Sequence, residues 1–121
     1  MLHKWTFFAQ IVSVVDGDTL KLDVDQGFRN WILGENFRLA RIDTPELKKD
    51  NNKGHESKGW VEEFIKNNSD KNKTILIECS KHGRYRWVIE VYLREFAGSK
   101  KYTINLNDMI VKAGMGVYKK Y

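Results

Sequence analysis

Apolar and polar side chains alternate twice in the first 25 residues, which is the pattern of half-buried β-strands. One alternating stretch covers residues 7–14 and a second covers residues 20–24. Between them lies Asp16-Gly17-Asp18-Thr19, whose aspartates and glycine favour a turn. The sequence therefore predicts a β-hairpin at the start of the chain.

A third strand is predicted over residues 37–42, and the single proline, Pro45, ends it because proline lacks a backbone donor. Residues 26–36 join the second strand to the third and are predicted to form a longer hairpin arm. The polar residues 47–53 that follow are predicted to be a loop.

Residues 74–79 and 87–93 predict two further strands, and residues 102–104 predict a short strand piece. Apolar residues at helical spacing predict one helix over residues 56–67 and a second over residues 106–113. Asn105 is suited to cap the second helix, and Gly114 to end it.

The resulting order is β-β-β-α-β-β-α. Five short strands with a helix after the third are typical of an OB-fold barrel, so we expect a mainly β (α+β) chain with a five-stranded barrel and two helices. We expect five aromatic side chains to lie in its core: Trp5, Phe7, Phe8, Trp60 and Phe64. Cys79, in an apolar alternation, is expected to be a small core residue, whereas Trp31 is equally compatible with a buried and an exposed position.

Length and composition indicate one globular domain over residues 1–121. The chain has 121 residues, 41% of them hydrophobic, and no apolar run near the roughly 20 residues that span a membrane. No secretory signal is visible at the start, an observation that does not separate a cytoplasmic chain from a processed secreted one. We expect no membrane partner and a monomer.

The net charge of +5 lies entirely in the second half of the chain. Residues 1–60 carry nine basic and nine acidic side chains, whereas residues 61–121 carry twelve basic and seven acidic ones. A basic surface attracts polyanions.

Three carboxylates stand at the ends of predicted strands. Asp18 lies at the first turn, and Asp43 and Glu46 flank Pro45. If the first and third strands pair, these acids converge at one rim of the barrel, where their mutual repulsion favours a bound cation. Because the donors are hard oxygens and zinc-type Cys and His spacing is absent, Ca²⁺ or Mg²⁺ is favoured.

Arginines accompany these acids. Arg38 precedes Asp43 in the third predicted strand, and Arg84 and Arg86 open the fifth. A guanidinium binds phosphate bidentately and stays charged. Metal, carboxylate base and arginines together are what phosphodiester hydrolysis requires.

The ordered motifs resemble those of the staphylococcal nuclease family over residues 6–118. They are Asp16-Gly17-Asp18-Thr19, Phe37-Arg38-Leu39 with Ile42-Asp43-Thr44-Pro45-Glu46, Gly83-Arg84 before a strand, and the stretch from Asn107 to Gly114. The sequence of the arm over residues 26–36 is similar to a segment of nucleases carried by phages and mobile elements.

The resemblance implies an OB-fold nuclease that cuts DNA and RNA with Ca²⁺, with Mg²⁺ less favoured, and leaves 3′-phosphate ends. It implies calcium ligands at Asp18, Asp43 and the Thr44 carbonyl, with Asp16 supporting them. It implies that Glu46 is the general base or a water-positioning group, and that Arg38 binds the phosphate.

The second phosphate-binding arginine stays open. The family's Gly-Arg order favours Arg84, and counting back from the fifth strand favours Arg86. Four residues are candidate nucleic-acid contacts: Lys81, His82, Tyr118 and Tyr121. The rival hypothesis is a catalytically inactive OB-fold module that binds nucleic acid or protein.

Overall fold

The structure, a computed structural model, describes residues 5–82 and 87–120, with residues 80–82 described through their backbone alone. The elements in chain order are β1 (Trp5–Asp16), β2 (Thr19–Asp25), β3 (Trp31–Leu39), β4 (Ile42–Asp43), α1 (Asn52–Asn68), β5 (Thr74–His82), β6 (Trp87–Arg94), β7 (Tyr102–Asn105), α2 (Leu106–Lys112) and β8 (Val117–Tyr118).

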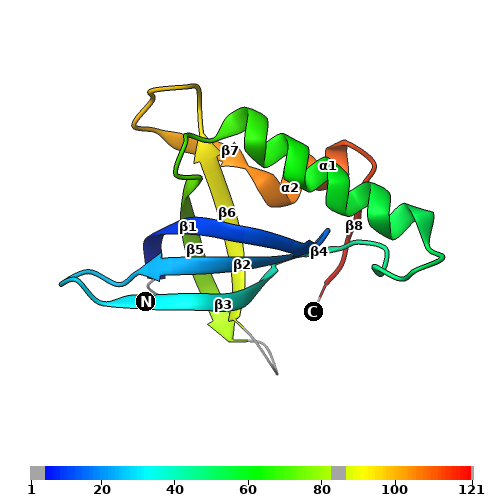
Figure 1. Ribbon diagram of the computed structural model, residues 1–121, viewed down its shortest axis with the longest axis horizontal. Helices are drawn as coiled ribbons and strands as arrows, with labels where there is room; N and C mark the ends of the chain where they lie inside the picture. Colours follow the sequence, from blue (N-terminus) through cyan, green and yellow to red (C-terminus); the bar gives the residue numbers. More distant parts are fainter. Residues whose placement is uncertain (1–4, 83–86, 121) are drawn as a thin grey trace.

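Five strands close into a barrel in the order β3-β2-β1-β5-β6, and a parallel pairing of β3 with β6 completes the circle (Figure 1). The predicted five-stranded OB-fold barrel with two helices is therefore confirmed. β7 extends the sheet beside β6, and β4 pairs with β8 in a separate two-stranded ribbon.

The core fills the barrel with the inward residues of the alternating strands, and α1 lies across one side of it (Figure 1). Leu20, Leu22 and Val24 of β2 are buried, as the alternation predicts. Val61 and Ile65 of α1 join the same cluster, and Cys79 is buried as expected. In the described part of the chain, neither helix is long and apolar enough to cross a membrane.

Several predicted boundaries differ from the structure, and two of them lie near the residues singled out for chemistry. The strand expected over residues 37–42 breaks into β3 and β4, because Arg41 adopts a φ of 66° and turns the chain. The first helix begins at Asn52 rather than near residue 56, because the Asn51 side chain accepts a hydrogen bond from the Gly54 amide and caps it.

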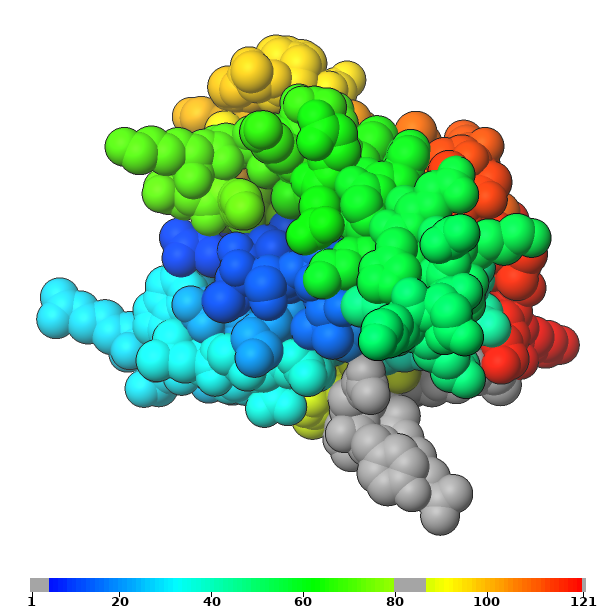
Figure 2. All heavy atoms as spheres, turned by 45° about the vertical axis from the view of Figure 1, so that its right-hand side comes forward, coloured from blue at the N-terminus to red at the C-terminus, as the bar shows by residue number. Residues whose placement is uncertain are grey.

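The predicted arm is present: Asp25 of β2 pairs with Trp31 of β3. Its tip stands out from the molecule in Figure 2, and Phe28 at that tip is 99% exposed. Trp31 is exposed.

The expectation that five aromatics lie in the core is wrong for two of them. Trp5 and Phe8 are exposed, because β1 begins at the outer end of the sheet and Phe8 faces outward. Phe8 packs edge-on against Tyr102, with ring centroids 5.5 Å apart. The other three are half-buried and pack against the core: Phe7, Trp60 and Phe64.

Candidate active site

Asp18 lies in the turn between β1 and β2, where its carboxylate is almost fully buried. Its own amide donates to the Asp16 Oδ1 atom at 3.1 Å, so the Asp16 side chain shapes the turn. Asp18 Oδ2 accepts the Thr44 amide at 3.1 Å and lies 2.7 Å from Arg38 Nη1. The buried carboxylate thus links the first turn to the end of β4.

Asp18 and Asp43 meet although β1 and β3 do not pair, which corrects the pairing assumed from the sequence. β2 lies between those strands, and its Thr19 pairs with Arg38 of β3. Arg38 then reaches both acids: Nη1 contacts Asp18, and Nη2 donates to Asp43 Oδ1 at 3.2 Å. One guanidinium therefore bridges the two carboxylates that were expected to hold a metal.

Burial, first of all, and the hydrogen bond with the Asp16 side chain raise the pKa of Asp18, and the charge of Arg38 opposes them; the net pKa is about 6. Burial therefore disfavours the ionised form of the Asp18 carboxylate. A second positive charge close to Asp18 would stabilise that ionised form.

Glu46 stands apart from this pair. Its side chain is 73% exposed and its Oε2 lies 2.9 Å from Lys48 Nζ. The backbone is fixed here because Asn51 Nδ2 donates to the Glu46 carbonyl at 2.8 Å. Of the three acids expected at one rim, the structure brings two together, and within residues 5–82 and 87–120 no three Asp, Glu, His or Cys side chains gather at a metal-binding distance.

The remaining candidates fall into two groups. Arg84, Arg86 and Tyr121 lie outside the described residues, and Lys81 and His82 are placed only as backbone at the end of β5. Tyr118 lies on β8 opposite Ile42 of β4, with its hydroxyl donating to Asp108 Oδ1 at 3.0 Å.

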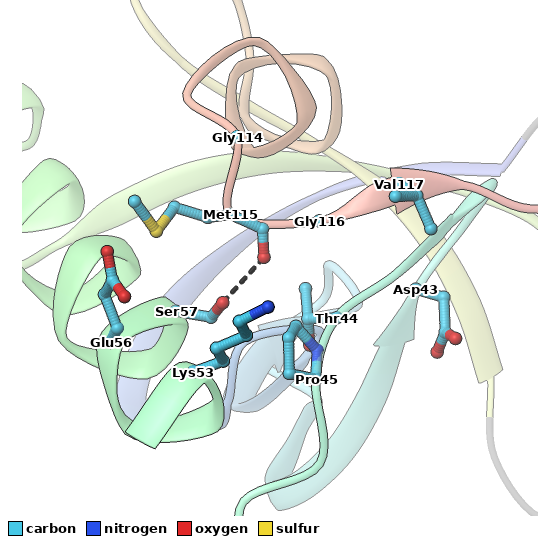
Figure 3. A pocket seen from close by; sticks show the side chains of 10 residues that line it. All are labelled: Asp43, Thr44, Pro45, Lys53, Glu56, Ser57, Gly114, Met115, Gly116 and Val117. Carbon is cyan, nitrogen blue, oxygen red and sulfur yellow. Dashed lines mark hydrogen bonds between the residues drawn. The ribbon is translucent and has the colours of Figure 1, made fainter. Parts of the chain in front are cut away.

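A pocket of about 370 Å³ adjoins the site between β4, the start of α1 and the segment that follows α2 (Figure 3). The Lys53 amine points into it, and Thr44 and Pro45 form one wall. Ser57 closes the back by donating to the Met115 carbonyl at 2.6 Å. Sequence reasoning assigned Lys53 to a loop and missed this pocket, because its walls come from three distant segments.

Three glycines lie close against the segment that carries Asp43 and Glu46. A Cβ on Gly17 would lie 2.7 Å from the Thr44 Oγ1 atom, and one on Gly116 would lie 2.9 Å from the Asp43 carbonyl oxygen. A Cβ on Gly54 would overlap the Glu46 carbonyl. The backbone at each of the three glycines therefore lies close against this segment. A larger residue at any of the three positions would force its neighbours to shift.

Comparison with known proteins identifies the family. Residues 36–121 match the family described as staphylococcal nuclease homologues. The chain belongs to that family. An uncharacterized protein of Methanocaldococcus jannaschii is 27% identical over 135 aligned positions, which take in 89% of this chain. The chain spans 57% of the length of that relative.

This staphylococcal nuclease homologue therefore joins a family of nucleases, which generally act as hydrolases on nucleic acids. The matched region includes Arg38, Asp43, Thr44 and Glu46, whereas Asp18 precedes it. The pairing of β2 with β3 brings Asp18 close to Arg38 and the residues that follow it.

Proposed function

We propose that the protein is a calcium-dependent nuclease that hydrolyses phosphodiester bonds of DNA and RNA with little base specificity and leaves 3′-phosphate ends. The observation that carries the proposal is the convergence of Asp18 and Asp43 on Arg38 at the rim of the barrel. Contacts to phosphate alone carry no sequence information, which is why little base preference is expected.

The donor chemistry fits a hard divalent cation. Two carboxylates face the same point, and the Thr44 backbone lies against Asp18, so Asp18, Asp43 and the Thr44 carbonyl would hold the ion. When bound, Ca²⁺ would supply positive charge that neutralises the two carboxylates and the phosphate oxygens.

The protein's own groups would then act on the substrate. Arg38 carries five N–H donors. Some of these guanidinium N–H groups would turn from the two carboxylates to the phosphate. Glu46 lies on an exposed loop end and would orient the attacking water and take its proton. As the water oxygen bonds to phosphorus, the bond from phosphorus to the 5′-oxygen would break. The 5′-oxygen would take a proton from solvent, and the phosphate would stay on the 3′ side.

The pocket beside Thr44 would give room to a neighbouring nucleotide. Its volume suits one nucleotide, and the Lys53 amine supplies a positive charge at its mouth (Figure 3).

One observation favours the rival binding module. Glu46 pairs with Lys48 and not with the acids around Arg38. In a module without catalysis, Arg38 and the basic second half would bind a nucleic-acid backbone, and Glu46 would be a surface residue.

Cleavage of single-stranded DNA and RNA with Ca²⁺, with Mg²⁺ and with a chelator separates these functions. We expect calcium-dependent cutting with 3′-phosphate ends, and a fall of about 100-fold or more in rate for Glu46→Gln. Glu62→Gln, on the exposed face of α1, is the matched control and should cut like the wild type.

One result would favour the binding module: tight binding of the oligonucleotide with no cutting under any of these metals. Undiminished cutting by a pure and folded Glu46→Gln protein would instead leave the protein a nuclease and remove Glu46 from the proposed mechanism.

A further inference from the structure

The chain makes a sharp corner between β3 and β4, and Arg41 occupies it. Its φ of 66° lies in the left-handed region, which glycine adopts easily and arginine rarely. Asp43 follows two residues later. The direction of the backbone from Arg41 to Asp43 therefore depends on the interactions that hold Arg41 in this conformation.

The Arg41 side chain is held by acids from two other elements. Nε and Nη2 donate to the two carboxylate oxygens of Glu90 on β6, at 2.8 and 2.7 Å. Nη2 also lies 3.0 Å from Asp108 Oδ1 in α2. The hydrogen bonds to Glu90 raise the pKa of Arg41, so the guanidinium stays charged. A bidentate pair fixes orientation as well as distance.

Two polar side chains complete this cluster. The Tyr118 hydroxyl donates to Asp108, and the centre of the Tyr118 ring is 5.8 Å from Arg41 Cζ. Asn105 Nδ2 donates to Glu90 Oε1 at 3.0 Å, while its own Oδ1 caps α2. We call Arg41, Glu90, Asn105, Asp108 and Tyr118 the Arg41 cluster.

The cluster acts on Asp43 through β8. Tyr118 pairs with Ile42, and Val117 pairs with Asp43. The Lys119 amide donates to the Arg41 carbonyl at 2.7 Å. The Arg41 backbone contacts Lys119 and its side chain contacts Tyr118, so Arg41 fastens β8 to β4 next to Ile42, the residue that precedes Asp43.

We propose that Arg41 is a positioning residue, whose guanidinium holds β4 so that Asp43 faces Asp18 across Arg38. Its catalytic consequence rests on the proposed nuclease function. The placement of β4 is a separate matter that can be measured in the metal-free protein.

The test compares two changes at Arg41 with a matched control. Arg41→Gln removes the charged fork, and Arg41→Gly removes it while suiting the positive φ, so any loss common to both comes from the guanidinium. Arg94→Gln is the control, because Arg94 also pairs with an acid (Asp70, 3.0 Å) and lies over a tyrosine ring (Tyr102, 5.7 Å).

The first measurement is hydrogen exchange of the Thr44 amide by NMR without metal. That amide donates to Asp18, so it reports directly on the joint between β4 and the first turn. We expect exchange to quicken at least about 10-fold, relative to amides of the core strands, in both Arg41 variants and not in Arg94→Gln. An unchanged ratio in the Arg41 variants overturns the inference, whatever the protein cleaves.

The second measurement is steady-state cleavage. We expect kcat to fall about 10- to 100-fold in both Arg41 variants with KM nearly unchanged, since a small displacement of a reacting group costs rate more than binding. Faster Thr44 exchange with unchanged kcat would overturn the catalytic consequence. A wild-type protein that cleaves nothing would instead overturn the proposed function, and the exchange result would still decide the role of Arg41.

Discussion

Asp18→Asn should stabilise the metal-free protein at neutral pH, although it removes a proposed metal ligand. The carboxyl is buried and its pKa rises from 3.8 to about 6. Because the pKa is raised in the folded state, the stabilising contribution of the protonated acid is complete below pH 4 and is lost as the pH rises through 6. The neutral amide of asparagine keeps a similar shape and carries no such dependence.

The magnitude follows from the two pKa values. Their difference of roughly two pH units corresponds to about 3 kcal/mol. Between pH 4 and pH 8, the free energy of unfolding of Asp18→Asn should therefore rise by about 3 kcal/mol relative to that of the wild type. The charge pairing with Arg38, at 2.7 Å, lowers the pKa of Asp18 and is therefore already included in the value of about 6.

Urea unfolding of both proteins in chelator, at several pH values from 4 to 8, measures this difference. Asp25→Asn, at an exposed turn where the carboxylate accepts the Gly27 amide, gives the baseline for losing one acid from the chain. A stability difference that stays flat or shrinks as the pH rises would refute the reasoning and show that Arg38 outweighs burial. Adding Ca²⁺ should then stabilise the wild type but not Asp18→Asn.

Three further changes test the surroundings of the site. Gly54→Ala should cost about 1–3 kcal/mol in urea unfolding and should also slow cleavage, because its methyl group overlaps the Glu46 carbonyl; a cost near zero would show that the loop is free to shift. Asn107→Ala should lower the free energy of unfolding by about 3 kcal/mol or more, since its buried amide serves the Val91 amide and two carbonyls; a loss below about 1 kcal/mol would contradict that role. The Cys79 thiol, whose pKa burial raises, should react slowly with a thiol reagent in the native protein and fast in urea, and rapid native reaction would contradict its burial.

The strands of the barrel were predictable because their signal is local. The alternation over residues 20–24 repeats every second residue, and the side-chain positions of a strand do the same, so the buried face of β2 follows from the sequence. The turn at Asp18 was predictable from residue chemistry for the same reason.

Other features depended on partners far along the chain. Glu90 is a charged residue amid apolar ones in a strand, a signal that something must satisfy it, but its partner Arg41 lies 49 residues away. The exposure of Trp5 likewise depends on where the barrel ends, which its hydrophobicity does not reveal, whereas Phe8 is exposed because it faces outward from β1.

By itself the sequence determined the five barrel strands, the two helices, the family and the chemical types of the candidate site residues, because each rests on local periodicity or on an ordered motif. Tertiary structure alone decided that Arg38 bridges Asp18 and Asp43, and that the corner at Arg41 is held from β6 and α2. These outcomes depend on strand register and on which charges are buried together, and both are fixed only when segments distant in the chain pack against each other.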